Sequence, residues 1–169
     1  MTARLTFLDH QLVLFKPYFH WADIKRFAVD STSSDRDLLS ALIESPEYHD
    51  HYAGQATEEQ DHHSLHGPYE LGAISPGVYE QSHPEEARVH LRRWLSAWLD
   101  GEQERVEVLA QFNDLVLPRL GGDAVYRLPD LRSTAEHEWG WVVGVDGFHE
   151  FVVMDRASRL LTLLVASDD

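Results

Sequence analysis

Near the end of the chain, an Asp146-Gly147 pair lies between two apolar runs, Trp139–Val145 and Phe148–Met154. Both central residues of a type I′ turn need positive φ, and Asp-Gly supplies this well, so the pattern predicts a β-hairpin. A further apolar run over residues 160–166 predicts another strand, and residues 124–128 fit a short one. We therefore expect a C-terminal antiparallel β-meander over residues 124–166.

Two amphipathic helices are predicted ahead of this meander. The first runs from residue 84 to 99 and the second from 103 to 117, so residues 84–117 form an antiparallel pair joined at Asp100-Gly101. The expected buried side chains are Ala87, Leu91, Trp94, Leu95 and Trp98 on the first helix, and Val106, Leu109, Phe112, Leu115 and Val116 on the second.

The first third of the chain is less regular. Ser34 and Asp37 resemble a capping box, and apolar residues at helical spacing then predict a helix over residues 35–44. Residues 4–19 fit either a strand or a short helix. Helices packed on an antiparallel sheet make an α+β fold, and 169 residues with 43% hydrophobic content suit a single globular domain over residues 1–169.

The hairpin register predicts that Glu150 lies among apolar side chains. Val143 is expected across from Glu150 on one side and Val165 on the other. A buried carboxylate either finds a cation or keeps its proton, so Glu150 is a candidate acid or base. Two structural alternatives remain open, because an arginine could pair with Glu150 or a one-residue slip could turn it to solvent.

On the opposite face, the same register places His149 across from Gly144. A glycine there would let a ligand approach the imidazole, or would only admit a covering helix. His149 and Glu150 are therefore the candidate catalytic residues of an enzyme.

A polar, histidine-rich segment spans residues 46–77, and it is expected to be a functional loop or a mobile one. Its candidate metal ligands are His49, His51, Glu59, His62 and His66. If the second half of the segment is helical, Glu59, His62 and His66 share one face and could offer a carboxylate and two imidazoles to a divalent metal. The alternative is a solvated polar loop.

Histidine stands beside aromatic residues at two other places. The candidate binding residues there are His20, Trp21, His137, Trp139 and Trp141. Such neighbours can stack on a flat ligand or hold a cation, and they also occur in ordinary cores.

The formal net charge is −15, from 29 acidic and 14 basic residues spread along the chain. A field of this sign repels phosphate backbones and anionic lipid, so neither nucleic acid nor a membrane surface is an expected partner, whereas a basic protein would be attracted. The chain has no cysteine and no apolar export segment near its start, which favours a cytoplasmic location.

Two functions follow from these observations. The first is an acidic, non-catalytic protein that binds a basic protein partner, in the manner of an inhibitor or an immunity protein, with no cofactor expected. The alternative is a small acid-base or metal-assisted enzyme, with Glu150 and His149 at the sheet and a divalent metal held by the middle histidines.

A local resemblance agrees with the first function. Residues 142–166, two predicted strands around Asp146-Gly147 and a third after Asp155-Arg156, resemble the antiparallel core of the bacterial SUKH immunity superfamily. The resemblance implies a protein that neutralises a partner by binding it.

Overall fold

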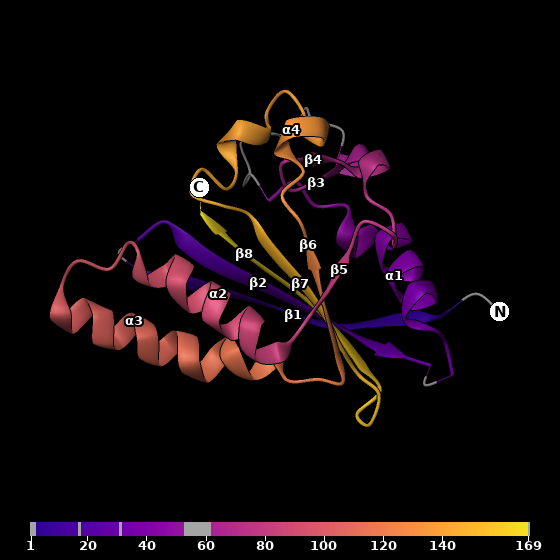
Figure 1. Ribbon diagram of the computed structural model, residues 1–169, viewed down its shortest axis with the longest axis horizontal. Helices are drawn as coiled ribbons and strands as arrows, with labels where there is room; N and C mark the ends of the chain where they lie inside the picture. The colour runs from indigo at the N-terminus through magenta and orange to yellow at the C-terminus, as the bar shows by residue number, and fades with distance from the viewer. Residues whose placement is uncertain (1–2, 17, 31, 53–61, 169) are drawn as a thin grey trace.

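The computed structural model describes residues 3–16, 18–30, 32–52 and 62–168, and Figure 1 shows them as one α+β domain. Within this described part, six strands form an antiparallel sheet in the order β1-β2-β8-β7-β6-β5. Their bounds are β1 Leu5–Phe15, β2 His20–Val29, β5 Glu80–Ser82, β6 Ala124–Leu128, β7 His149–Asp155 and β8 Leu160–Asp168. A small hairpin of β3 (Leu65–His66) and β4 (Tyr69–Glu70) stands apart from this sheet. The predicted C-terminal meander is confirmed, because β6, β7 and β8 are consecutive neighbours.

Helices cover both faces of the sheet (Figure 1). Their bounds are α1 Asp35–Glu44, α2 Pro84–Ser96, α3 Glu102–Leu115 and α4 Arg132–Ala135, and short 3-10 helices occupy Pro46–Tyr48, His62–Ser64, Leu71–Ala73, Leu117–Leu120 and Gly140–Val142. On β7, Phe151 and Val153 pack in the cluster beneath α2 and α3, whereas Val152 and Met154 pack in the cluster beneath α1. The sheet is therefore buried on both sides, as the apolar strand pattern predicts.

Strands β1 and β2 complete the sheet. The segment that fits either a strand or a short helix is the edge strand β1, and β2 inserts between β1 and β8. On β2, Ala22 and Ile24 face the α2 and α3 side, while Trp21 and Phe27 face the α1 side.

The three predicted helices are present, and some of their predicted buried positions are corrected. Helix α1 has the predicted bounds, and the Ser34 side chain accepts a hydrogen bond from the backbone N–H of Asp37. Helix α2 is capped by His83. The buried stripes were wrong at two positions, because Trp98 is 44% exposed beyond the end of α2 and Val106 is 64% exposed on α3. Val108 is buried on α3 instead.

The Trp139–Val145 strand prediction was wrong, and with it the hairpin. Residues 140–142 form a 3-10 helix, and β7 pairs with β6 on one side and β8 on the other. Both edges of β7 are thus occupied, so no edge remains for a strand from the preceding residues. Gly147 still turns the chain with φ +130°.

The register between β7 and β8 is as predicted. Glu150 pairs with Val165, and its other neighbour is Leu128 of β6 rather than Val143. Glu150 and His149 lie on opposite faces, since residues alternate sides along a strand.

Candidate functional site

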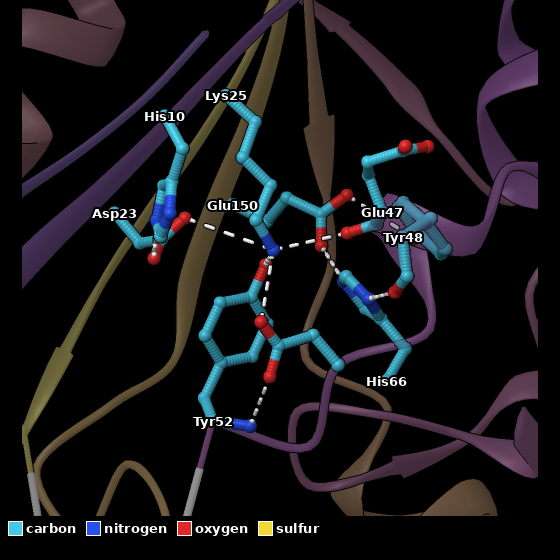
Figure 2. A network of polar contacts seen from close by, with 9 residues as sticks. His10, Asp23, Lys25, Glu47, Tyr48, Tyr52, His66 and Glu150 are labelled. Carbon is cyan, nitrogen blue, oxygen red and sulfur yellow. Dashed lines mark hydrogen bonds and ion pairs between the residues drawn. The ribbon is translucent and has the colours of Figure 1, made fainter. Parts of the chain in front are cut away.

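Charged side chains lie on the α1 face of the sheet, across three neighbouring strands. Asp23 on β2 pairs with Val165 on β8, which pairs in turn with Glu150 on β7. Lys25 lies two residues after Asp23 and so points to the same face. Figure 2 shows that residues of the 46–52 segment and His66 complete a polar network around them. We call this group the buried polar network.

Glu150 is at the centre of one half of the network and is 0% exposed. One carboxylate oxygen lies 2.5 Å from Nε2 of His66, which is also 0% exposed. The other oxygen accepts hydrogen bonds from the hydroxyls of Tyr79, at 2.5 Å, and Tyr48, at 3.1 Å. The carboxylate is therefore fully partnered although no solvent reaches it.

The backbone fixes a hydrogen on one nitrogen of the His66 ring. Its Nδ1 lies 2.6 Å from the carbonyl oxygen of Tyr48, which can only accept, so Nδ1 carries a hydrogen. The ring also stacks on Tyr48, with centroids 3.6 Å apart. Burial and the neighbouring Glu150 raise the pKa of Tyr48 and of Tyr79 well above the usual value, so both hydroxyls stay protonated and donate.

Lys25 organises the other half of the network. Its ammonium donates to a carboxylate oxygen of Asp50 and to the carbonyl of Glu47, both at 2.9 Å. Asp23 lies 3.8 Å from the same ammonium, and its other oxygen lies 2.5 Å from Nε2 of His10 on β1 (Figure 2). Burial raises the pKa of Asp23, whereas for Asp50 the effect of burial is outweighed by Lys25 together with the backbone N–H of Tyr52, so the pKa is lowered. The network thus ties the 46–52 segment to the sheet.

The buried polar network is better suited to holding the 46–52 segment on the sheet than to catalysis. Glu150 and His66 are enclosed, and each has its hydrogen-bonding partners inside the protein. The sequence pointed to Glu150 through strand alternation, but it missed Lys25, Tyr48 and Tyr79. A signal for Lys25 existed, because Trp21, Asp23, Lys25 and Phe27 alternate along β2 and share the buried α1 face.

His149 lies on the other face, beneath α2. Its Nδ1 is 2.8 Å from Nε2 of His90, and its ring meets the edge of Trp94. The glycine predicted to lie against the His149 imidazole was wrong, because Gly147 rather than Gly144 occupies this position. Burial, His90 and Arg127 lower the pKa of His149 to about 3, so the ring is neutral near pH 7.

The structure describes three of the predicted histidine ligands, His49, His51 and His66. His49 contacts the carbonyl of Ile43 through Nε2, His66 contacts Glu150, and His51 is buried. Glu59 and the side chain of His62 lie outside the described residues. Among the described residues, the one group of three side chains placed to share a metal ion includes no middle histidine; it consists of His20, Asp146 and Asp168.

The predicted binding residues fall into two groups. Trp21 is 6% exposed and stacks on Tyr52, so it belongs to the core. His20 is also 6% exposed. In contrast, Trp139 is 48% exposed and Trp141 is 63% exposed.

Both exposed tryptophans lie on one connection, residues 138–147, which we call the tryptophan loop. His137 stands at its start, and its Nδ1 accepts from the N–H of Trp139, so Nε2 donates to the carbonyl of Gly67. Further along, the Arg132 guanidinium donates to the carbonyl oxygens of Val143, at 2.8 Å, and Gly144, at 2.6 Å.

The far end of the tryptophan loop is fastened to β8. The N–H of Gly144 donates to the carbonyl of Asp168, and the Ser167 hydroxyl donates to the carbonyl of Gly147. The N–H of Asp146 donates to the Asp168 carboxylate. The loop backbone is therefore held at both ends while its large side chains face outward.

Comparison with known proteins gives no relative: no protein-family model, curated protein or solved structure matches this chain. The resemblance of residues 142–166 to the SUKH immunity superfamily receives no support from these comparisons. Within the described part of the chain, no helix combines the length and apolar character that crossing a membrane requires.

Proposed function

We propose that this protein is a non-catalytic binding protein and that the tryptophan loop is its contact surface for a basic protein partner. The observation that carries the proposal is the outward placement of Trp139 and Trp141 on a loop whose backbone is fastened by hydrogen bonds. Tryptophan is enriched among the few residues that dominate interface energies, and a fixed loop loses little entropy on binding.

Apolar side chains around the tryptophans extend this surface. Val142 is 37% exposed and Val145 is 66% exposed on the same loop. An exposed apolar surface of this kind commonly marks an interaction site, because water contact with apolar area is unfavourable.

The charge around the loop indicates the partner. Glu138 and Asp146 are exposed on the loop, and the sequence has no lysine or arginine between Ser133 and Asp155. The nearby Arg132 is paired with Glu136 and with the loop carbonyls. Together with the formal net charge of −15, this favours a partner with a positive surface.

The alternative of an acid-base or metal-assisted enzyme has weaker support. It needs Glu150 or His149 to meet a substrate, but Glu150 and its partner His66 are both 0% exposed. His149 pairs with His90 and packs against Trp94.

The test begins with immobilised protein and a whole-cell extract, followed by purification of each retained protein of high isoelectric point. Each purified candidate is then titrated against wild type, a Trp139→Ala/Trp141→Ala variant and a Leu8→Ala/Val106→Ala control, which removes exposed apolar side chains elsewhere. We expect the double tryptophan variant to weaken binding by about 30-fold or more, since a hot-spot residue contributes about 2 kcal/mol or more. If every candidate binds the double tryptophan variant as tightly as it binds wild type and the control, the tryptophan loop is not the contact surface.

A further inference from the structure

A second feature lies where β2, β8 and the tryptophan loop meet. His20 on β2 and Asp168 on β8 are direct cross-strand partners, so their side chains point to the same face. Asp146 approaches from the loop, because its N–H is bonded to the Asp168 carboxylate. One ligand atom from each of the three side chains lies within 4.8 Å of the others.

The imidazole of His20 gives an independent indication that a ligand belongs here. The side chain is 6% exposed, yet among the described residues neither Nδ1 nor Nε2 has a hydrogen-bond partner. Buried polar atoms without a partner are uncommon in folded proteins, and each calls for an explanation such as an ion. The ring is also held in place, because it packs against Trp94 and Trp98 with centroids 5.0 and 5.9 Å away.

We infer that His20, Asp146 and Asp168 form a binding site for a divalent transition-metal ion, with zinc as the ion that best suits one imidazole and two carboxylates. Zinc takes histidine nitrogen at about 2.0–2.1 Å and carboxylate oxygen at about 2.0–2.2 Å, and it accepts three protein ligands with water in the fourth position. Ligand atoms within 4.8 Å of one another can gather around such an ion by side-chain rotation, and Asp146 is exposed.

The position of the site suggests what the ion does. It would join the start of β2, the end of β8 and the tryptophan loop through side chains, next to hydrogen bonds that already link Gly144 and Gly147 to β8. A divalent cation would also offset the two adjacent carboxylates. This inference does not depend on the proposed function, because the three ligand side chains lie together whether or not the loop binds a protein.

Zinc binding by the full chain tests the inference. Protein stripped with a chelator is dialysed against Zn²⁺, and bound metal is measured by elemental analysis and titration calorimetry. The compared variants are Asp146→Asn, which retains the side-chain shape at an exposed position; Asp114→Asn, which changes another exposed aspartate; and His62→Gln/His63→Gln, which removes two histidines of the middle segment.

We expect one equivalent of zinc in wild type and in both controls, and at least a tenfold weaker affinity in Asp146→Asn. Nitrogen NMR of the imidazoles provides a second measurement, in which zinc shifts the signal that His20→Gln removes. Failure of wild type to bind stoichiometric zinc would overturn the site. Loss of zinc in His62→Gln/His63→Gln with retention in Asp146→Asn would assign it to the middle histidines instead.

Discussion

Glu150 is a carboxylate that folding has removed from water, and its effect on stability depends on its partners. The carboxylate receives hydrogen bonds from Tyr48 and Tyr79 and contacts His66, all within the protein. Burial of these four polar groups is tolerated only while they satisfy one another. The group should therefore behave as one unit in unfolding experiments.

We predict that Glu150→Leu lowers the free energy of unfolding by about 3–5 kcal/mol, because it leaves Nε2 of His66 and two buried hydroxyls without their partner. Urea denaturation followed by circular dichroism measures this loss. Glu70→Gln, at an exposed position, is the control and should change stability by less than about 0.5 kcal/mol. A small loss in Glu150→Leu would mean that the network does not hold the middle segment in place.

His149 predicts a distinct response to acid. Its pKa is lowered to about 3 in the folded protein, against 6.5 for an ordinary histidine. Between these values the unfolded chain binds a proton at His149 that the folded chain does not. The contribution of His149 to the free energy of unfolding is therefore fully present well above pH 6.5 and is lost as the pH drops.

Well below pH 6.5, His149 contributes about 1.4 kcal/mol per pH unit to the slope of the free energy of unfolding against pH. We therefore predict that His149→Gln flattens the pH dependence of the free energy of unfolding between about pH 6 and pH 4.5 by about that amount. Thermal or urea unfolding across this range measures it. Parallel curves for wild type and variant would show that folding does not lower the pKa of His149.

Glu150 also shows which contacts can be predicted from the sequence and which cannot. Alternation along β7 and β8 was enough to place Glu150 opposite Val165 on a buried face. Its partner His66 is 84 positions away in the sequence, and no local pattern connects the two. Partners of this kind depend on how the chain folds back, which strand periodicity does not encode.

Among the helices and strands, local signals were sufficient where an element is regular. Helix α1 follows its capping signal, and β6 follows its short apolar run. The Asp146-Gly147 signal failed because a hairpin also needs a free strand edge, and β6 and β8 occupy both edges of β7. Local turn chemistry was overridden by strand pairing between distant segments.

The corrected face of α3 gives a test at this level. Val108 is 2% exposed and Val106 is 64% exposed, although the sequence pattern favoured Val106 as the buried residue. We predict that Val108→Ala lowers the free energy of unfolding by about 2 kcal/mol through lost burial and the remaining cavity, while Val106→Ala changes it little. Equal losses in the two variants, measured by urea denaturation, would contradict the observed packing of α3.

For the molecule as a whole, the net charge and the exposed aromatic surface both favour the proposed basic protein partner. The formal net charge of −15 would speed encounter with a basic protein, and the tryptophan loop would then supply contacts that slow its release. We predict that Trp139→Ala/Trp141→Ala leaves the free energy of unfolding within about 0.5 kcal/mol of wild type, because substitutions at exposed sites rarely affect stability. A large loss of stability would mean that these side chains support the fold.

The decisive measurement is a calorimetric titration of the purified basic partner against wild type and Trp139→Ala/Trp141→Ala at low and high salt. Screening shortens the range of charge interactions from about 10 Å at 0.1 M salt to about 3 Å at 1 M. We predict that the dissociation constant of wild type rises about tenfold or more over this range, and that the variant binds more weakly at both concentrations. Binding that is insensitive to salt and unchanged in the variant would contradict both the proposed partner and the proposed surface.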